Sequence, residues 1–342
     1  MTSEYKIDDM RTEAFSRKRD AILEKISRAG TIGISGHRNP DGDCIGACLA
    51  MQTYIQEHFP GTAACVFLDE ISDKFNYLQG ADQIRFAKEE EEAFDLFIAL
   101  DCSDADRLHH HKDYFLGADY RICIDHHTTN EGFGDLCLVV PEASSTCEIL
   151  FYLMEEEEIS LPCAEALYTG IVHDTGVFAH TNTGRLTMEA AGALLEKGVN
   201  SEEIIDGSFY RRTYIQTQIL GRALMESIMM LDGRMIFSRI RRKEMKFYGV
   251  DAKDMDGIID QLRLTGNVDC ALFLYELEDG SFKASLRSSD RVDVSRIARH
   301  FGGGGHVKAA GCTMLGEVRD IVMNIAQEVE IQLDNPVKED DD

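Results

Sequence analysis

The chain has 342 residues, enough for two domains, and 44% of them are hydrophobic, yet no apolar run approaches the length of a membrane span. Its net charge of −26 argues against long duplex nucleic acid as a partner, because a phosphate backbone requires a basic surface. The polar N-terminus is unlike a signal peptide, and ten cysteines without a CxxC pair indicate buried thiols in a reducing environment, so we expect a cytoplasmic protein.

Apolar runs alternate with helical patterns over the first 200 residues. A first helix is expected within residues 1–30. Strands are expected at Thr31–Ser35, Ala64–Leu68, Phe94–Leu100, Tyr120–Ile124 and Leu136–Val140. Helices are expected at Cys44–Tyr54, Ser145–Glu155, Ala164–Val172 and Thr187–Glu196. This alternation is typical of a doubly wound, mostly parallel α/β sheet, which we predict for residues 1–200.

Residues 201–231 look mostly helical and are predicted to connect to a second, smaller mixed α/β domain at 232–334. Its expected strands are Met235–Ile240, Cys270–Leu277 and Phe282–Leu286, and its expected helices are Asp254–Leu264, Val294–Phe301 and Val318–Leu333. Residues 206–312 hold 17 Lys and Arg against 14 Asp and Glu, whereas the rest of the chain holds 18 against 47. The second domain is therefore better suited to an anionic substrate. The acidic tail 335–342 is predicted to be disordered.

Three side chains that can bind metal, His37, Asp41 and Asp43, fall within seven residues directly after the first predicted strand. In an open parallel sheet, the turn after a strand is where ligands bind. Two carboxylates two residues apart can serve two neighbouring ions, with His37 on the first. A plain helix entry with Asp43 as N-cap is the alternative, but it leaves His37 and Asp41 unexplained. Cys44 and Cys48 are predicted to be core residues.

Asp101 follows another buried strand and is predicted to point into the same crevice as His37. A carboxylate in this position is well placed to bridge two ions. The alternative is a loop aspartate that caps the next helix, and Asp101 alone does not decide between them. Arg107 is predicted either to approach a phosphate or to pair with Asp104 or Asp106.

A further strand is followed by Asp125, His126 and His127. Adjacent histidines at the end of a strand are poor core residues and good ligands. We predict that His126 binds metal, that Asp125 orients an imidazole, and that His127 contacts the substrate. Asp174, at the end of an apolar helix, is predicted to complete the coordination of a second ion. The run His109–His111, in contrast, is expected to be a solvated surface.

Four separate segments thus supply four aspartates and two histidines. Carboxylate combined with imidazole suits Mn²⁺ better than Zn²⁺ or Ca²⁺. Two ions about 3.5–4 Å apart can lower the pKa of a bridging water and stabilise both the attacking and the leaving oxygen at phosphorus. The residues therefore predict a phosphohydrolase with two metal ions.

The chain resembles the DHH phosphoesterase family in four motifs, which occur in the order found in that family. They are His37-x-Asn39-Pro40-Asp41-Gly42-Asp43, Asp101-x-Ser103-x3-Arg107, Asp125-His126-His127 and Asp174-Thr175-Gly176. The resemblance implies that one Mn²⁺ is bound by His37 and Asp41. It implies that the other is bound by Asp43, His126 and Asp174, with Asp101 bridging both. His127 would contact the scissile phosphate or help to protonate the leaving oxygen.

The glycine-rich stretch Phe301–Gly311 resembles the signature of the first type of DHH-associated domain. Consecutive glycines let backbone N–H groups approach an anion closely, although a flexible turn is the simpler interpretation of the run alone. His306 and Lys308 add charge, and the segment Ser285–Ser289 supplies an arginine fork suited to phosphate. The residues predicted to bind substrate are Arg107, Arg287, Ser288, Gly303, Gly304, Gly305 and His306.

This second domain distinguishes the chain from family II inorganic pyrophosphatases. The length leaves no room for the extra domains of RecJ-like exonucleases or for the membrane and sensor segments of GdpP-like enzymes. The resemblance is therefore to the compact nanoRNase type. These proteins degrade very short oligoribonucleotides and often remove the 3′-phosphate from pAp. The type implies a homodimer that holds a substrate of dinucleotide size between its domains.

One departure from the family pattern leaves the order of substrate preference open. Many relatives place an arginine where this chain has Ala179. A phosphodiesterase for cyclic or linear dinucleotides is therefore the main alternative. A catalytically silent nucleotide-binding sensor is a further alternative, which is disfavoured because no metal ligand is missing.

Overall fold

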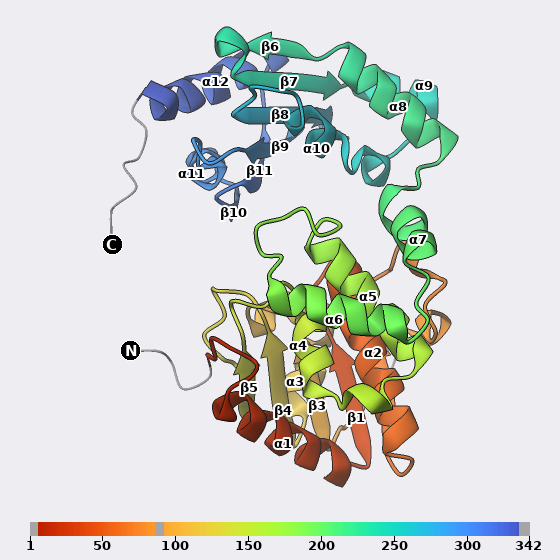
Figure 1. Ribbon diagram of the computed structural model, residues 1–342. Coiled ribbons are helices and arrows are strands. Elements are labelled where there is room, and N and C mark those ends of the chain that lie inside the picture. Colours follow the sequence, from red (N-terminus) through yellow and green to blue (C-terminus); the bar gives the residue numbers. More distant parts are fainter. Residues whose placement is uncertain (1–5, 86–91, 335–342) are drawn as a thin grey trace. The chain divides into compact units, whose positions relative to one another are not determined.

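The computed structural model describes residues 6–85 and 92–334, apart from the side chain of His306 (Figure 1). The chain divides into two compact units, Met1–Arg211 and Arg212–Asp342. The division falls inside the stretch that the sequence assigns to the connector, and the predicted acidic tail lies outside the described residues.

The first unit is built on a five-stranded sheet in which all strands run parallel. Its strands are β1 (Thr31–Ser35), β2 (Ala63–Phe67), β3 (Leu96–Leu100), β4 (Tyr120–Asp125) and β5 (Leu136–Val139). Their spatial order is β2-β1-β3-β4-β5, so the winding direction reverses between β1 and β3. In open parallel sheets, ligands bind in the crevice at the carboxyl ends of the strands beside this reversal.

Helices cover both faces of this sheet. They are α1 (Glu13–Arg28), α2 (Gly42–His58), α3 (Lys112–Gly117), α4 (Thr146–Leu153), α5 (Leu161–Asp174), α6 (Arg185–Glu196) and α7 (Ser201–Ile204). Alternate residues of β3 show the two layers, because Leu96 and Ile98 enter a large core with α1, α2, α4 and α5. Phe97 and Ala99 instead enter a smaller aromatic core with α3. The predicted doubly wound fold is confirmed.

The second unit contains a mixed six-stranded sheet in the order β10-β11-β9-β8-β7-β6. Its strands are β6 (Ile228–Met230), β7 (Met235–Ile240), β8 (Cys270–Glu276), β9 (Phe282–Ser288), β10 (Gly304–His306) and β11 (Ala309–Met314). Its helices are α8 (Tyr214–Met225), α9 (Arg242–Tyr248), α10 (Ile258–Arg263), α11 (Val294–His300) and α12 (Val318–Asp334). Only β7 and β8 pair in parallel, with α11 and α12 on one face and α8 and α10 on the other. This agrees with the predicted second, mixed α/β domain.

Several short elements of the second unit differ from the sequence-based expectation. β6 lies in the stretch expected to be helical, and the glycine-rich run forms β10 rather than a turn. β6 has only three residues and β10 is mainly glycine, so neither strand carries an alternating apolar signal. The helix expected over Asp254–Leu264 is interrupted at Gly257, whose backbone is left-handed with φ of 76°. A 3₁₀ turn, Ala252–Met255, precedes this break.

The histidine run of the first unit is only partly exposed. His109 and His110 are exposed, whereas His111 is buried and its ring centroid lies 5.8 Å from that of Phe67. Burial lowers the pKa of His111 to about 4, and its Nδ1 lies 3.4 Å from the hydroxyl of Ser35. The prediction of a solvated surface is therefore wrong for His111, because this residue completes the aromatic layer under the sheet.

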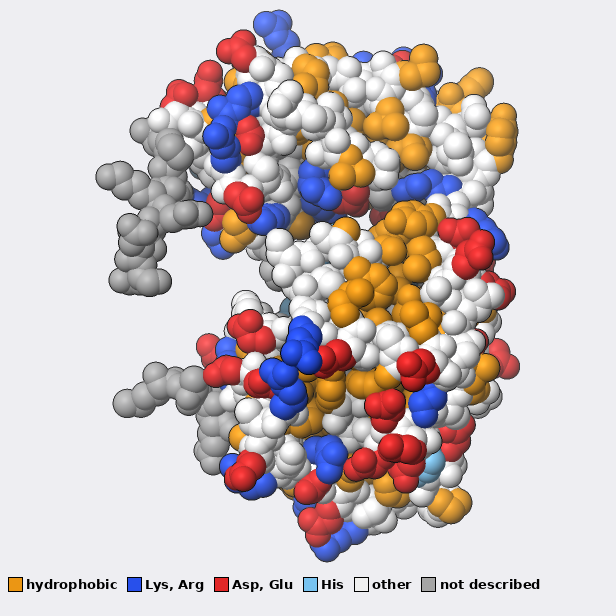
Figure 2. Space-filling model, in the orientation of Figure 1, with side chains coloured by type: hydrophobic (Ala, Val, Ile, Leu, Met, Phe, Trp, Pro, Cys, Tyr) orange, Lys and Arg blue, Asp and Glu red, His pale blue; other side chains and the backbone are white. Residues whose placement is uncertain are grey.

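Three global properties bear on the expectations from composition. All ten cysteines carry free thiols and nine of them are buried, which confirms the predicted buried thiols. Within the described ranges, no helix combines the length and apolar character that a membrane crossing requires. On the face of the molecule shown in Figure 2, Lys and Arg side chains are scattered among acidic ones.

Candidate active site

The predicted metal ligands gather at one edge of the parallel sheet. The register pairs Ser35 of β1 with Ala99 of β3, and Leu100 of β3 with Ile124 of β4. The loops that follow these three strands therefore begin at the same edge, and the end of α5 adds Asp174 to the group. All six predicted ligands lie in this cluster, which is what convergence of strand ends in a parallel sheet predicts.

Asp101 lies at the centre of the cluster. Its Oδ2 is 3.3 Å from Nε2 of His37, while its Oδ1 is 3.5 Å from Nε2 of His126. The residue is 2% exposed, and Oδ1 also accepts a hydrogen bond from the hydroxyl of Thr146 at 3.2 Å. Its backbone is left-handed, with φ of 55°, a conformation that residues other than glycine adopt rarely and at an energetic cost. One oxygen of this carboxylate thus faces His37 and the other faces His126, which is how a carboxylate that bridges two metal ions is arranged.

His37 and Asp41 form one side of the cluster. The Nδ1 of His37 lies 2.9 Å from the carbonyl oxygen of Arg38, so Nε2 is left to face Asp41 Oδ2 at 3.7 Å. The other oxygen of Asp41 accepts backbone N–H bonds from Asp43 and Cys44 at the start of α2. Asp41 is therefore the N-cap of this helix, and the alternative that gave this role to Asp43 is wrong.

Asp43, His126 and Asp174 form the other side, with one ligand atom of each within 4.8 Å of the others. The Nδ1 of His126 lies 3.3 Å from the carbonyl oxygen of Ala143, and Nε2 lies 3.4 Å from Asp174 Oδ2. Each oxygen of Asp43 accepts one backbone N–H from the first two residues of α4, at 2.7 and 2.9 Å. The N-terminus of a helix stabilises a carboxylate in this position.

The electrostatics of the cluster favour cations. Burial raises the pKa of Asp43 well above its usual range, and the charges of Asp101 and Asp174 add to this. Burial also raises the pKa of Asp174, to about 6, against the opposing effect of His126. Burial alone would lower the pKa of His126, but the hydrogen bond to Asp101 and the charge of Asp174 outweigh it and raise that pKa. The cluster therefore contains more buried carboxylates than positively charged side chains to neutralise them.

This donor set fits two divalent cations. Carboxylates with imidazoles are suitable ligands for Mn²⁺, and both imidazoles present Nε2 because a backbone carbonyl lies beside Nδ1. The thiol of Cys44 also lies within 4.8 Å of the ligand atoms of His37 and Asp101. Burial raises the pKa of Cys44 well above its usual range, which disfavours its thiolate.

A second pair of side chains lies beside this cluster. Asp125 is fully buried, and its Oδ1 lies 2.8 Å from Nδ1 of His127. Its Oδ2 accepts a hydrogen bond from the side chain of Asn130 at 2.7 Å, and the same amide nitrogen donates to the carbonyl of Cys102. This chain of contacts fixes the imidazole of His127 and leaves its Nε2 available. The Asp–His pair is predictable from its motif, whereas Asn130 carries no motif signal and was not predicted.

The backbone after Asp174 is also strained. The three residues Gly176–Phe178 all have positive φ, between 55° and 62°, and two of them have bulky side chains. The hydroxyl of Thr175 supports the turn, since it donates to the carbonyl of Ile171 at 2.6 Å and accepts from the backbone N–H of Phe178 at 3.0 Å. Such strain persists where surrounding structure enforces it and is common at functional sites.

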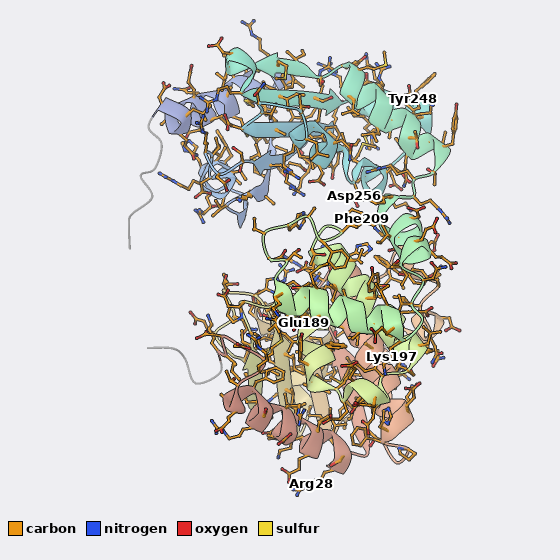
Figure 3. The ribbon with its side chains drawn as sticks, viewed as in Figure 1. Arg28, Glu189, Lys197, Phe209, Tyr248 and Asp256 are labelled. Carbon is orange, nitrogen blue, oxygen red and sulfur yellow. The ribbon has the colours of Figure 1, made fainter. Side chains whose placement is uncertain are left out.

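His173 belongs to the packing beneath the site. Its Nε2 lies 2.9 Å from the hydroxyl of Ser208, and its ring centroid lies 5.4 Å from that of Phe209, which Figure 3 labels. A Cβ on Gly42 would lie 2.2 Å from the His173 ring. The glycine of the first motif is thus explained by this close approach.

Two arginines lie in the loops that supply ligands. The backbone N–H of Arg38 donates to the carbonyl of Arg107 at 2.8 Å, which joins the first two loops. Asp104 accepts the backbone N–H of Arg107, and Asp106 pairs with Lys112. Among the described residues, no carboxylate lies within ion-pair distance of either guanidinium. The sequence analysis named Arg107 and missed Arg38, although Arg38 lies inside the first motif.

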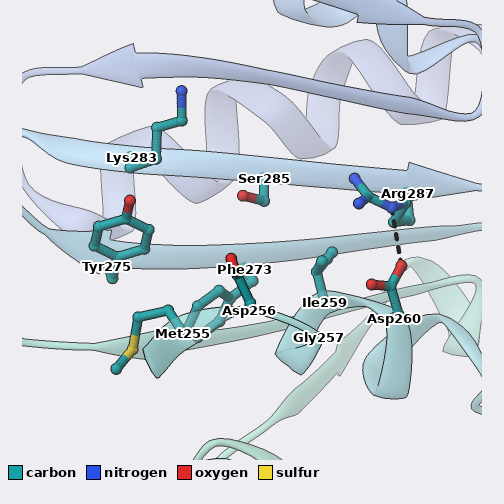
Figure 4. Close-up of a pocket in the computed structure, with 10 residues that line it drawn as sticks. All are labelled: Met255, Asp256, Gly257, Ile259, Asp260, Phe273, Tyr275, Lys283, Ser285 and Arg287. Atoms are coloured by element: carbon teal, nitrogen blue, oxygen red, sulfur yellow. Dashed lines mark hydrogen bonds and ion pairs between the residues drawn. The ribbon is translucent and has the colours of Figure 1, made fainter. Parts of the chain in front are cut away.

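The second unit has a pocket of about 370 Å³ that contains Arg287 (Figure 4). Its lining consists of Met255, Asp256, Gly257, Ile259, Asp260, Phe273, Tyr275, Lys283, Ser285 and Arg287. The Nε of Arg287 donates to Asp260 at 2.9 Å, which fixes the guanidinium at the end of the pocket. Two cationic side chains, two aspartates, two hydroxyls and two aromatic rings thus line one concave surface.

Strand alternation separates two of the predicted substrate residues. Lys283, Ser285 and Arg287 face the pocket, whereas Ser288 is buried and its hydroxyl donates to the carbonyl of Val307 at 3.3 Å. The structure therefore does not place Ser288 with Arg287, because successive residues of a strand point to opposite faces. Ser285 takes that position, because β9 continues to Ser288, past Leu286, where the predicted strand ended.

The glycines of the run differ in their surroundings. A Cβ on Gly303 would lie 2.2 Å from the carbonyl oxygen of Gly311, and one on Gly305 would lie 2.5 Å from that of Ala309. A Cβ on Gly304 would meet no atom within 4 Å. The predicted contact of the His306 side chain lies outside the described residues.

Alanine at Gly303 and at Gly304 should therefore have different effects. We expect Gly303→Ala to lower the free energy of unfolding by about 1–3 kcal/mol, the usual effect of a forced overlap. Gly304→Ala should change it by less than about 0.5 kcal/mol. Because the added methyl group would point into open space beside the glycine-rich hairpin, it should instead raise KM for a phosphate substrate several-fold. Urea unfolding measures the free energy, and steady-state kinetics measure KM. An unchanged KM for Gly304→Ala would exclude an approach of substrate to Gly304.

Two family profiles match the chain. The N-terminal domain of the DHH family matches residues 31–171, and the DHHA1 domain matches residues 232–330. These ranges contain every strand described above except β6, the glycine-rich hairpin and five of the six predicted metal ligands, because the first profile ends before Asp174.

Characterised relatives span most of the chain. A bifunctional oligoribonuclease and PAP phosphatase NrnA from Thermus thermophilus is 30% identical over 84% of this chain and 85% of its own length. The protein of the same name from Bacillus subtilis is 26% identical over 86% of this chain and 92% of its own length. The cyclic-di-AMP phosphodiesterase GdpP of Bacillus subtilis is 26% identical over 86% of this chain but only 47% of its own length.

A solved structure also matches along nearly the whole chain. It is an exopolyphosphatase-related protein from Bacteroides fragilis, with a TM-score of 0.87 and 25% identity, and the match covers 94% of this chain and 97% of that one. The crystal structure of RecJ from Thermus thermophilus in complex with Mn²⁺ has a TM-score of 0.54 at 15% identity over 94% of this chain and 55% of that one, a likeness of fold alone.

Proposed function

Because this chain belongs to the DHH family of phosphoesterases, hydrolases of phosphoester bonds, we propose that it cleaves very short oligoribonucleotides and removes the 3′-phosphate from pAp. The observation that carries this proposal is the position of Asp101, with one oxygen toward His37 and the other toward His126. The relatives named NrnA support the choice of substrates. We assign hydrolysis to residues 1–200 and substrate binding to residues 232–334.

The proposal gives each side of the cluster one Mn²⁺. His37 and Asp41 would hold one ion, Asp43, His126 and Asp174 the other, and Asp101 both. Two such cations supply a water of lowered pKa and stabilise the attacking and leaving oxygens at phosphorus. The carbonyl oxygens beside both Nδ1 atoms support this assignment, because a fixed tautomer keeps Nε2 free for a metal.

His127 would act on the substrate itself. With Asp125 accepting a hydrogen bond from Nδ1–H, the imidazole would carry a second proton on Nε2 and donate it to a phosphate oxygen or to the leaving oxygen. Asp125 does not contact the substrate in this proposal, so it is a positioning residue that acts through His127. The hydrogen bond from Asn130 holds Asp125 in place.

Cationic side chains would bind the remaining phosphates. Arg107 and Arg38 have no carboxylate partner among the described residues, so both guanidinium groups can bind an anion without first losing an ion pair. In the second unit, the fork of Arg287 and the hydroxyl of Ser285 would bind another phosphate, and the aromatic lining of the pocket suits a base.

Arg287→Lys should weaken substrate binding more than turnover. A lysine keeps the charge but loses the bidentate geometry, so we expect KM for a 5′-phosphorylated RNA dinucleotide to rise about tenfold, with kcat changed less than about threefold. Arg263→Lys is the matched control, since Arg263 lies on α10 outside the pocket lining. Equal KM values for the two variants would contradict the role of Arg287.

A direct assay tests the proposed substrates. The purified protein with Mn²⁺ is given pAp, a 5′-phosphorylated RNA dinucleotide and cyclic di-AMP under identical conditions. The proposal expects higher kcat/KM for the first two. The similarity to GdpP makes cyclic dinucleotides the second candidate class of substrate. Ala179 is the position at which this chain differs from the family pattern. If none of the three is hydrolysed, only the catalytically silent sensor is left as an interpretation.

We further propose a cytoplasmic homodimer. Light scattering on the purified protein measures its mass and so tests whether it is a dimer.

A further inference from the structure

A second group of potential metal ligands lies outside the active site. It consists of Asp69, which follows β2, and of His109 and His110 from the 3₁₀ segment Ala105–His111. One ligand atom of each lies within 4.8 Å of the other two. The proposed phosphoesterase reaction uses none of these side chains.

The distances within this group suit a tetrahedral metal. The Nδ1 of His109 is 3.5 Å from Oδ2 of Asp69. Two ligands at about 2.0–2.2 Å from a tetrahedral zinc are separated by about 3.4 Å. The rings of His109 and His110 have centroids only 3.7 Å apart and are tilted by 52°. Two imidazoles and a carboxylate thus converge where consecutive histidines of a regular helix would diverge.

The backbone explains this convergence. His109 has φ of 51° and ψ of −115°, which interrupts the 3₁₀ segment and turns its ring toward its neighbour. A histidine rarely adopts this left-handed region, and such strain is found where a site requires it. His111 is not part of the group, because it is buried and its Nδ1 faces Ser35.

We propose that Asp69, His109 and His110 bind Zn²⁺, with water in the fourth position. Imidazoles with a single carboxylate favour zinc, whereas the active-site cluster, rich in carboxylates, suits Mn²⁺. The ion joins the loop after β2 to the loop that carries Arg107. The carbonyl of Arg107 in turn accepts the N–H of Arg38 in the first ligand loop, so the zinc site stabilises the loops around the active site.

Zinc binding can be measured without reference to hydrolysis. Wild-type protein and His110→Asn are dialysed against ZnCl₂ with saturating Mn²⁺, and zinc per chain is determined by elemental analysis. We expect the variant to retain one zinc fewer than the wild type. Any zinc that displaces Mn²⁺ in the active site is the same in both, so the difference reports this site alone. Equal zinc content in the two proteins would overturn the proposal.

Two further proteins complete the experiment. His300→Asn removes a histidine that also lies near a carboxylate, 3.8 Å from Glu328, but has no third ligand beside it in the part of the chain that the structure describes, so it should keep the wild-type zinc content. Asp69→Asn should behave like His110→Asn and weaken zinc binding at least about tenfold. Zinc should raise the unfolding temperature of the wild type and of His300→Asn but not that of the two ligand variants. A uniform rise in all four proteins would contradict the site.

Discussion

Asp101→Asn is expected to lower kcat/KM for pAp by about 10³-fold or more, the scale of losing a group that stabilises the transition state directly. Asparagine keeps the shape of the side chain and tolerates the left-handed backbone at this position, where φ is 55°. The amide carries no charge and has only one acceptor oxygen, so it cannot face His37 and His126 with two oxygens. Steady-state kinetics with Mn²⁺, together with the metal content of the variant, measure the effect.

Asp104→Asn is the matched control for this variant. Asp104 lies in the same loop, and its side chain caps the following 3₁₀ segment, a role that asparagine fills equally well. We expect its kcat/KM to stay within about twofold of the wild type. If Asp101→Asn retained wild-type turnover, the bridging role of Asp101 would be wrong.

Asp125→Asn should lower kcat about 10²–10³-fold while leaving the metal content unchanged. The carboxylate accepts from Asn130 and orients the Nδ1 of His127, whereas an amide at this position must present its NH₂ to one of these partners. If the NH₂ faces His127, the imidazole loses its Nδ1 proton and takes the other tautomer. The unchanged metal content distinguishes this effect from that of Asp101→Asn.

The dependence of this effect on His127 is tested by combining variants. If Asp125 acts only by orienting His127, then Asp125→Asn should cost little activity once His127 has been replaced by glutamine. The double variant should therefore be about as active as His127→Gln alone. Fully additive losses would show that Asp125 acts independently, contrary to the proposal.

The sequence was sufficient to predict the sheet of the first unit and the gathering of its ligands. Each predicted strand is mostly apolar, and each ligand motif lies at the end of a strand or helix. Parallel strands bring such ends to one edge, so His37, Asp101 and His126 could be placed together without coordinates. The choice of N-cap was less certain, because Asp41 and Asp43 both carry the right side chain. Only the backbone conformation decides for Asp41.

The second unit was harder to predict, for physical reasons. β10 and β11 consist largely of glycine, alanine and other small residues, whose propensity for strands is weak, so pairing with β9 determines their structure. Alternation along β9 places Ser285 with Arg287 and Ser288 on the opposite face, but the predicted strand ended at Leu286, so the pattern was not extended to Ser288. Asn130 and Arg38 act through contacts across loops, which no local pattern in the sequence reveals.

The most direct test of the account is the activity of the protein as Mn²⁺ is removed and restored. The central claim is that six side chains from separate segments hold two cations that are required for hydrolysis. After exhaustive chelation we expect no measurable hydrolysis of pAp or of an RNA dinucleotide. Activity should then return in proportion to the binding of a second equivalent of Mn²⁺ per chain. Full activity in the metal-free protein, or with a single equivalent bound, would contradict the claim.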